Sequence, residues 1–478
     1  MSHNHENGAE VASEGDSPIF VERKLGQSPG DDAAAIVDRL IRAGMSPAEA
    51  QGKGRAFSQV EAELAGSHGA ARNLYRLFVP GRIEVLGKHT DYAGGRSLLA
   101  AVERGFCIAA AAREDDTVRI VDAACGERSS FQLQPELAPA VGHWSNYPMT
   151  VARRVARNFR GPLRGADIAL ASDLPPAAGM SSSSALMIGI FHVLSHVNGL
   201  PQREEFRANI AGPESLAGYL ATIENGQNFG SLAGDRGVGT FGGSEDHTAI
   251  CCCRPGHLHL YAFCPVRQQQ VIALPEGYLL AIGSSGLLAE KTGEAMAKYN
   301  RASRLVGALL DLWRAETGRD DRCLADAVHS AADAAERLRH MARRGHAGFD
   351  GPALQRRLQQ FLEENERIIP AAVQALERGA VALFGRCVDQ SQQMAEQLLQ
   401  NQTPETVYLA RWARQCGAEA ASAFGAGFGG SVWALLKTAA AQDFLAAWSG
   451  GYRQAFPVEA RRAAFFPSGA GPGLLEIG

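Results

Sequence analysis

The chain has 478 residues, more than one hydrophobic core usually holds, so at least two lobes are expected. Lys and Arg total 47 against 51 Asp and Glu, and this near balance excludes a globally basic nucleic-acid binder. No apolar stretch is long enough to cross a bilayer, and the first 18 residues are polar and acidic rather than a signal peptide. We therefore expect a cytoplasmic protein with reduced cysteines and with neither nucleic acid nor membrane as a partner.

The N-terminal 70 residues are predicted to be an extension that is first disordered and then helical. Residues 1 to about 30 are poor in apolar side chains. Apolar residues recur at helical spacing from 31 to 43, and the capping box Ser46-Pro47-Ala48-Glu49 opens a second helix. We expect this helix to reach about residue 64, with a break near residues 52–54.

The rest of the chain mixes strands and helices, which predicts an α/β (α+β) fold. A long apolar stretch covers 97–112, and strands are expected at 74–78, 118–121, 129–133, 166–171, 248–253, 257–263, 279–284, 431–436 and 463–466. Helices are expected at 147–159, 184–197, 203–210, 214–224 and 407–423, over most of 289–399, and after Ala440. A boundary near residues 265–280 divides an N-terminal lobe (71–270) from a C-terminal lobe (271–478).

The first of three glycine-rich motifs follows the strand at 74–78 and reads PGRIEVLGKHTDYAGG, from Pro80 to Gly95. It gathers Arg, Lys, His and Asp within ten residues. Such a cluster suits a polyhydroxylated ligand, because Asp accepts hydrogen bonds from sugar hydroxyls while His and Lys donate them. Taken alone, the motif also fits a solvated turn with a surface salt bridge.

The second motif, DLPPAAGMSSSSA, runs from Asp173 to Ala185 between a predicted strand and a predicted helix. Small residues let backbone N–H groups approach an anion, and the helix directs its positive N-terminus towards it. Serine hydroxyls can also bind Mg²⁺. Taken alone, the motif also fits a serine-rich helix cap.

The third motif, Gly425-Ala426-Gly427-Phe428-Gly429-Gly430, formally satisfies G-x-G-x-x-G. A dinucleotide-binding fingerprint follows a strand and opens a helix. Here a helix is predicted before the motif and a strand after it, so we exclude that interpretation. No Walker A sequence occurs in the chain either.

In this order and spacing, the three motifs resemble those of the GHMP small-molecule kinases, and among them the galactokinases. The family's first motif reads roughly G-R-x-N-L-I-G-E-H-T-D-Y-x-G-G, and this chain has Glu84 for Asn and Lys88 for Glu. The second matches P-x-G-x-G-L-S-S-S-A with Ala177 for a Gly, and the third matches in full. The resemblance spans about residues 74–470 and includes three shorter landmarks: Trp144-x-Asn146-Tyr147, Gly243-Ser244-Glu245-Asp246 and Tyr299-Asn300-x-x-Ser303.

The resemblance implies a two-lobed GHMP kinase fold with the active site between the lobes. It also implies transfer of the γ-phosphate of ATP, with Mg²⁺, to the anomeric hydroxyl of galactose or a related sugar. By position, the catalytic pair is Arg82 and Asp246. The implied sugar contacts are Lys88, His89, Asp91, Gly243 and Tyr299. The implied ATP contacts are Trp144, Ala178, Gly179, Ser181, Ser182, Ser183, Ser184 and Gly427, and the implied metal ligands are Ser182 and Glu224.

Three alternatives stay open. Lys88 offers three donors where the family has an acceptor, so a uronic acid such as galacturonate is a candidate substrate. A different kinase of the superfamily, with an amino-acid or isoprenoid acceptor, is disfavoured by the His-Thr-Asp-Tyr stretch. A catalytically silent sugar and ATP sensor is disfavoured by the presence of the catalytic and metal positions.

The role of Asp246 has two versions. As a general base it takes the proton of the sugar hydroxyl. Since an adjacent Arg lowers the pKa of a carboxylate and so makes it a weaker base, the second version is that Asp246 mainly orients the hydroxyl.

Overall fold

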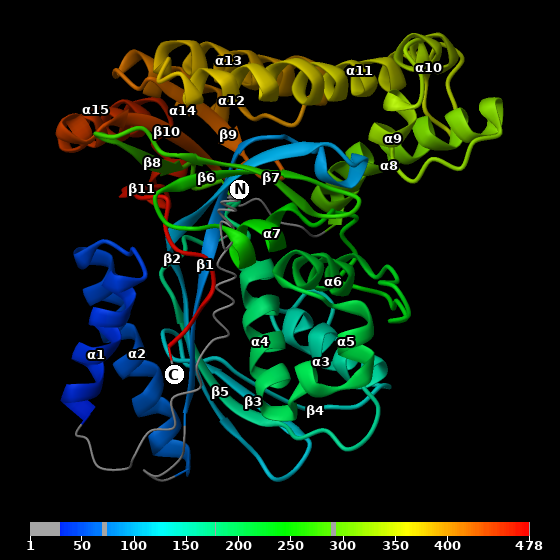
Figure 1. The fold of residues 1–478 in the computed structure, drawn as a ribbon. Helices are drawn as coiled ribbons and strands as arrows, with labels where there is room; N and C mark the ends of the chain where they lie inside the picture. Colours follow the sequence, from blue (N-terminus) through cyan, green and yellow to red (C-terminus); the bar gives the residue numbers. More distant parts are fainter. Residues whose placement is uncertain (1–28, 69–73, 177, 288–292, 478) are drawn as a thin grey trace, which may run out of the picture.

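The computed structural model describes residues 29–68, 74–176, 178–287 and 293–477 (Figure 1). Nearly all of the segment predicted to be disordered, and Ala177 of the second motif, lie outside the described residues. Helices and strands mix along the whole described chain, which confirms the predicted fold class.

The larger sheet has eight strands among the described residues. They are β1 (Tyr75–Leu86), β2 (Arg96–Ala112), β3 (Thr117–Asp122), β4 (Arg128–Gln132), β5 (Ala166–Ser172), β6 (His257–Ala262), β7 (Arg267–Ala273) and β12 (Leu475–Glu476). The order is β12-β1-β2-β5-β3-β4. Strand β2 is long enough to pair with β5 along its second half and with β6 along its first, and β7 extends the sheet beyond β6.

Helices cover both faces of this sheet (Figure 1). On one face lie α3 (Asn146–Asn158), α4 (Ser182–Asn198), α5 (Glu204–Asn209), α6 (Pro213–Asn225) and α7 (Glu245–Cys252). Helix α4 is apolar on nearly all sides, as expected of a helix enclosed by other elements. On the other face lie α1 (Pro29–Arg42) and α2 (Pro47–His68), whose buried Phe57 and Val60 share a core with Phe78, Cys107 and Ala169 of the sheet.

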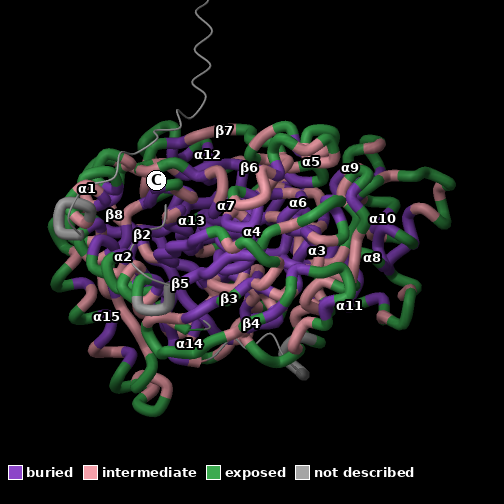
Figure 2. The backbone as a smooth tube through the Cα atoms, turned by 90° about the horizontal axis from the view of Figure 1, so that it is seen from below, coloured by how far each residue is buried: buried purple, intermediate pink, exposed green. Residues whose placement is uncertain are grey.

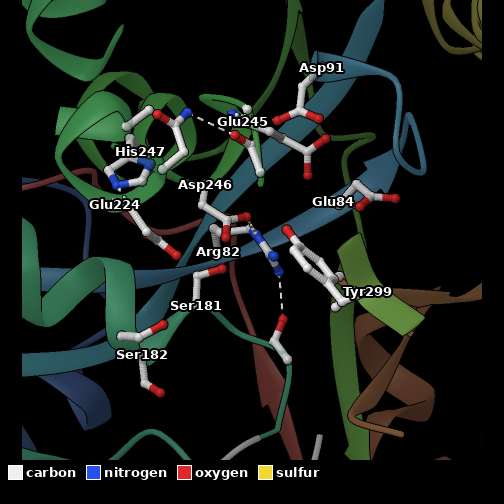
Figure 3. Close-up of a pocket in the computed structure, with 18 of the residues that line it drawn as sticks. Arg82, Glu84, Asp91, Ser181, Ser182, Glu224, Glu245, Asp246, His247 and Tyr299 are labelled. Atoms are coloured by element: carbon white, nitrogen blue, oxygen red, sulfur yellow. Dashed lines mark hydrogen bonds and ion pairs between the residues drawn. The ribbon is translucent and has the colours of Figure 1, made fainter. Parts of the chain in front are cut away.

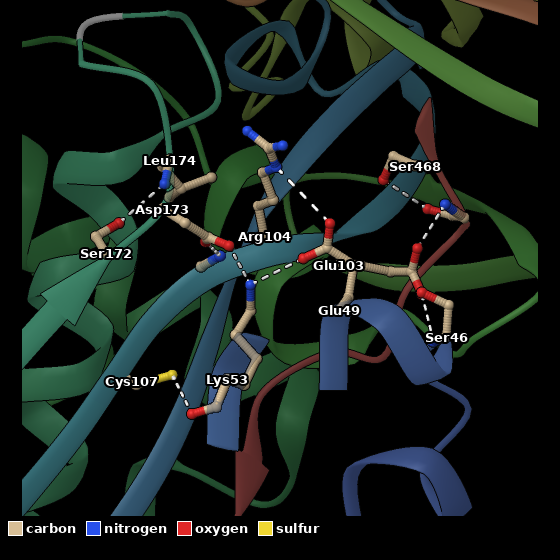
Figure 4. A network of polar contacts seen from close by, with 12 residues as sticks. Ser46, Glu49, Lys53, Glu103, Arg104, Cys107, Ser172, Asp173, Leu174 and Ser468 are labelled. Atoms are coloured by element: carbon tan, nitrogen blue, oxygen red, sulfur yellow. Dashed lines mark hydrogen bonds and ion pairs between the residues drawn. The ribbon is translucent and has the colours of Figure 1, made fainter. Parts of the chain in front are cut away.

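Polar contacts also fasten α2 to the sheet (Figure 4). The buried Lys53 ammonium pairs with Asp173 and donates to Glu49 at 3.2 Å. Asp173 in turn accepts from the backbone N–H of Gly105 at 2.8 Å. Because Asp173 begins the second glycine-rich motif, the helix pair supports the loop that carries this motif.

The smaller sheet has the order β11-β8-β10-β9, built from β8 (Tyr278–Ser284), β9 (Ala420–Phe424), β10 (Ser431–Lys437) and β11 (Ala464–Ser468). Its helices are α12 (Ile369–Glu377), α13 (Val381–Met394), α14 (Pro404–Gln415) and α15 (Ala441–Ala455). A separate helical core around Trp313 joins α8 (Gly293–Thr317), α9 (Leu324–His329), α10 (Ala334–Ala342) and α11 (Gly351–Leu362). Buried segments gather in the middle of the molecule and exposed ones at its rim (Figure 2).

Three predicted elements are wrong. The run predicted as a strand at 248–253 belongs to helix α7, whose first turn carries Glu245 and Asp246, favourable charges at a helix N-terminus. The predicted helix at 407–423 is α14 followed by strand β9. Helix α2 passes through residues 52–54 without a break, and a Cβ on Gly54 would lie 2.6 Å from Val37, so this glycine lets α1 and α2 approach closely.

The chain passes from the larger to the smaller sheet between β7 and β8, and its last strand, β12, returns to β1. The predicted boundary between residues 270 and 271 falls within β7, and the C-terminal end of the chain pairs with the larger sheet. The division into two lobes there stays a prediction. None of the described helices has both the length and the hydrophobicity needed to span a lipid bilayer.

Candidate active site

A cavity of about 520 Å³ brings the three glycine-rich motifs together (Figure 3). Its walls come from β1 and the loop after it, the start of α4, the start of α7, α8 and the loop between β9 and β10. The ionisable side chains that line it are Arg82, Glu84, His89, Asp91, Tyr92, Tyr147, Glu224, Glu245, Asp246, His247 and Tyr299.

Arg82 is the residue at which the motifs meet. It lies on β1, is only 4% exposed, and donates from Nε to Asp246 Oδ1 at 2.5 Å. Its Nη1 donates to the carbonyl of Gly179 in the second motif at 2.6 Å. A Cβ on Gly425 of the third motif would lie 2.8 Å from that same carbonyl oxygen and 3.4 Å from Arg82 Nη2. The missing side chain at Gly425 thus leaves room for the guanidinium and its carboxylate partner.

Asp91 and Gly243 lie side by side, as the predicted sugar contacts require. Asp91 Oδ2 accepts from the backbone N–H of Glu245 at 3.2 Å. A Cβ on Gly243 would approach Asp91 Oδ2 to 2.4 Å, so no larger residue fits there without displacing the carboxylate. Burial raises the pKa of Asp91 to about 6, and the backbone N–H groups of Tyr92 and Glu245 oppose this rise.

His89 lines the cavity with both ring nitrogens already in contact with protein groups. Nε2 lies 3.2 Å from the carbonyl oxygen of Ala426 and Nδ1 lies 2.8 Å from the hydroxyl of Tyr92. Because a carbonyl only accepts, Nε2 carries the proton and Nδ1 accepts from Tyr92. Burial, and then Arg357, lower the pKa of His89 to about 4, so the ring is neutral at pH 7. Tyr299 of α8 completes this wall, with its ring centroid 5.8 Å from that of His89.

Lys88 is the sugar contact that the structure corrects. Its side chain is 1% exposed and does not line the cavity. Nζ lies 3.0 Å from Ser391 Oγ on α13, and Ser391 donates to Glu364 at 2.9 Å. The Lys88 ammonium therefore points away from the cavity and binds Ser391, so it does not reach a sugar there. This removes the argument that Lys88 selects a uronic acid.

The serine-rich motif forms the opposite end of the cavity. Gly179, Ser181, Ser182, Ser183 and Trp144 line it, as predicted for nucleotide contacts, and helix α4 begins at Ser182. Ser181 Oγ and Trp144 Nε1 are buried and have no hydrogen-bond partner among the described residues. Unpaired donors at a helix N-terminus fit a ligand rich in anionic oxygens, such as a nucleotide phosphate chain.

Glu224 extends this end of the cavity from α6. Its Oε2 accepts from Ser184 Oγ at 2.7 Å and lies 3.4 Å from His247 Nε2. No group of three or more His, Cys, Asp or Glu residues in the described chain is arranged to hold a metal by itself. A serine hydroxyl at Ser182 and the Glu224 carboxylate fit Mg²⁺, which usually takes one or two protein oxygens and completes its octahedron with water and phosphate.

Three predicted nucleotide contacts lie outside the cavity lining. The carbonyl of Ala178 accepts from Ser431 Oγ at 2.6 Å, a contact between the two sheets' elements. Ser184 is occupied by Glu224, and a Cβ on Gly427 would lie 2.3 Å from the carbonyl oxygen of Asn401. The cavity lining therefore does not support these three contacts, and they stay predictions.

Two carboxylates in the cavity were not predicted as site residues. Glu84 lies on β1 two residues after Arg82, and Glu245 directly precedes Asp246. The two side chains are hydrogen-bonded to each other, and Glu245 Oε2 also accepts from Ser97 Oγ at 2.7 Å. Burial raises the pKa of Glu84 to about 7 and that of Glu245 well above its usual range. At Glu84 the sequence did carry a signal for a site residue, because this position departs from the Asn of the family motif.

Comparison with known families adds three matches along the chain. Residues 67–112 match the galactokinase galactose-binding signature, which contains the first glycine-rich motif. Residues 146–225 match the N-terminal domain of GHMP kinases, and residues 372–454 match the GHMP kinase C-terminal region. The three matches together cover elements of both sheets.

Individual relatives agree with these matches. A galactokinase of Roseiflexus sp. (strain RS-1) is 28% identical over 369 residues, 76% of this chain and 84% of the relative. A galactokinase of Chloroflexus aggregans is 28% identical over 375 residues, which cover 78% of this chain and 86% of the relative. The crystal structure of Lactococcus lactis galactokinase with galactose has a TM-score of 0.71 at 22% identity, covering 88% of this chain and 99% of that one, and shows a shared fold.

Proposed function

The chain belongs to the GHMP kinase family and carries its galactokinase galactose-binding signature, and from this premise we propose that it is an ATP-dependent sugar 1-kinase. The proposed reaction transfers the γ-phosphate of ATP to the anomeric hydroxyl of galactose or a related sugar. The observation that carries the proposal is the convergence of all three motifs on the Arg82–Asp246 pair in one cavity.

The sugar end of the cavity supplies acceptors for hydroxyl groups. Asp91, placed against Gly243, is proposed to accept from a sugar hydroxyl, and the Tyr299 ring bounds the same space. His89 is proposed to hold this wall in place, because both of its ring nitrogens are engaged by Tyr92 and Ala426. Lys88 has no part in this set.

Asp246 is proposed to orient the anomeric hydroxyl and take its proton. It is the acidic group that Arg82 holds at the junction of the sugar and serine-rich ends. A positioned carboxylate of this kind contributes through general-base catalysis and alignment. Arg82, fixed on its other side by the Gly179 carbonyl, is proposed to stabilise negative charge that develops beside it.

Kinases of this family use ATP, which supplies the phosphoryl group. We propose that Gly179, Ser181, Ser182 and Ser183 cradle its phosphates at the start of α4, and that Trp144 lies beside the nucleotide. Ser182 and Glu224 are proposed to hold Mg²⁺, with Ser184 fixing the orientation of the Glu224 carboxylate.

A coupled assay of ADP release with purified protein, ATP and Mg²⁺ tests the function across a panel of sugars and non-sugar acceptors. The proposal expects ADP release that depends on galactose or a close relative. Release with an amino-acid or isoprenoid alcohol alone would place the chain elsewhere in the superfamily. Binding of sugar and ATP without ADP release would identify a sensor instead.

A further inference from the structure

The sugar end of the cavity holds more carboxyl groups than the proposed chemistry uses. Five carboxylates line the whole cavity, namely Glu84, Asp91, Glu224, Glu245 and Asp246, against the single guanidinium of Arg82. Asp246 is matched by Arg82, Glu224 is assigned to the metal, and Asp91 is assigned to a hydroxyl. Glu84 and Glu245 remain, next to each other and next to Asp91 (Figure 3).

Glu84 is a buried carboxylate whose hydrogen bonds are incomplete. It is 3% exposed, lines the cavity, and its Oε1 has no hydrogen-bond partner among the described residues. A buried carboxylate oxygen without a partner is costly, so such an atom in a cavity wall indicates a missing ligand group. The described residues form no cluster of three or more metal-ligating side chains there, and a donor on an organic ligand would satisfy this oxygen.

Lys88 and Arg82 are close enough for their charges to oppose the rise in the pKa of Glu84, but neither makes a hydrogen bond or ion pair with it among the described residues. Lys88, the nearest lysine in sequence, donates to Ser391 and makes no ion pair with Glu84 within the described chain. Arg82 is committed to Asp246 and to the Gly179 carbonyl. The hydrogen-bond partner that Glu84 does have is Glu245, a second carboxyl group, whose own pKa burial raises well above its usual range.

We propose that Glu84, backed by Glu245, determines specificity in this site and that the preferred substrate is an amino sugar whose ammonium group binds to this acidic pair. The inference rests on the proposed kinase function and names its substrate class. An ammonium offers three donors and a positive charge, so it would hydrogen-bond to the pair and favour its ionised form. A uronic acid would bring a further carboxylate into the same wall and is rejected.

The size of the effect follows from the chemistry of the contact. A hydrogen bond between charged groups raises binding affinity by about tenfold or more relative to a hydrogen bond between neutral groups. The raised pKa values of Glu84 and Glu245 agree with this view, because burial outweighs the nearby positive charges and favours the protonated forms of both groups. An ammonium would stabilise the ionised pair.

The test compares kcat/KM at pH 7 for galactose, its 2-amino-2-deoxy and 6-amino-6-deoxy derivatives, and galacturonate. The wild-type protein is expected to favour at least one amino sugar over galactose by about tenfold, and galactose over galacturonate by a similar factor. Glu84→Gln should remove about tenfold from the amino-sugar preference while changing galactose less. Glu84→Asn, which restores the residue of the family motif, is the second variant if Gln impairs folding.

Glu114→Gln is the matched control, because this carboxylate is 96% exposed and pairs with Arg164 at the surface. It should leave all ratios unchanged. The proposal is overturned if the wild type prefers galactose to both amino sugars, or if neither Glu84 variant changes the ratio. If no sugar causes ADP release, the kinase function fails, and calorimetric binding of the same four sugars, with the same expected order, decides the inference separately.

Discussion

Asp246 is the residue on which the proposed chemistry most depends, because it accepts a hydrogen bond from Arg82 and lines the cavity with the proposed sugar contacts. Asp246→Asn keeps the shape but removes the acceptor for the hydroxyl proton. We expect kcat to fall about 10²–10⁴-fold. Unchanged ATP binding and an unchanged melting temperature would assign the loss to catalysis, whereas kcat near that of the wild type would remove Asp246 from its role.

Glu84 gives a second prediction, for stability in the absence of sugar. Its folded-state pKa is raised from the ordinary 4.5 to about 7 by burial. Folding therefore favours the protonated form, and this contribution to stability is present below about pH 4.5 and is lost as the pH rises through 7. Gln mimics the protonated side chain at every pH.

Glu84→Gln should accordingly raise the free energy of unfolding relative to the wild type by about 1–3 kcal/mol at pH 8, and by much less at pH 5. Urea unfolding of both proteins at the two pH values measures the difference. A variant that is destabilised equally at both values would mean that Glu84 is ionised and well paired without a ligand.

At the scale of elements, the helix pair that precedes β1 has a clear structural role. Helix α2 buries Phe57 fully against the face of the larger sheet, and Lys53 ties the same helix to the loop that begins at Asp173. The sequence predicted two helices here but not which strands they pack against, because the partners of Phe57 lie on distant strands.

Phe57→Ala should lower the free energy of unfolding by about 3–5 kcal/mol, the usual effect of leaving a cavity in a core. Ile41→Ala on α1 is the matched control, because Ile41 is 39% exposed and should cost far less. Denaturant melts of both variants make the comparison. Equal, small losses would show that the helix pair is only loosely attached.

The elements also show where sequence reasoning succeeds and where it stops. The three glycine-rich motifs were identified because their backbone demands are local: Gly87, Gly179 and Gly425, one in each motif, adopt positive φ. The strand predicted at 248–253 failed because a short apolar run fits a strand or a buried helix equally well.

The prediction that Lys88 contacts the sugar failed for a different reason. Its direction depends on Ser391, 303 residues away, and no local pattern reveals such a partner. Glu84 is the converse case, since a departure from the motif marked the position but only the fold shows that it faces the cavity beside Glu245.

At the scale of the whole molecule, the site exists only where the two sheets meet. Arg82 comes from the larger sheet, the Gly425 loop from the smaller one, and Tyr299 from helix α8, which lies between β8 and β9 in the sequence. The Ser431 hydroxyl donates to the Ala178 carbonyl across this junction at 2.6 Å. The sugar and serine-rich ends are thus held at a fixed separation by contacts between elements far apart in sequence.

The most direct test of the central claim is to identify the product by ³¹P NMR after incubating the protein with ATP, Mg²⁺ and galactose or an amino derivative of galactose. The account predicts a sugar phosphate whose phosphorus couples to the anomeric proton, formed together with ADP and strongly reduced with Asp246→Asn. Phosphate on any other hydroxyl, or no sugar phosphate with any of these sugars, would contradict it.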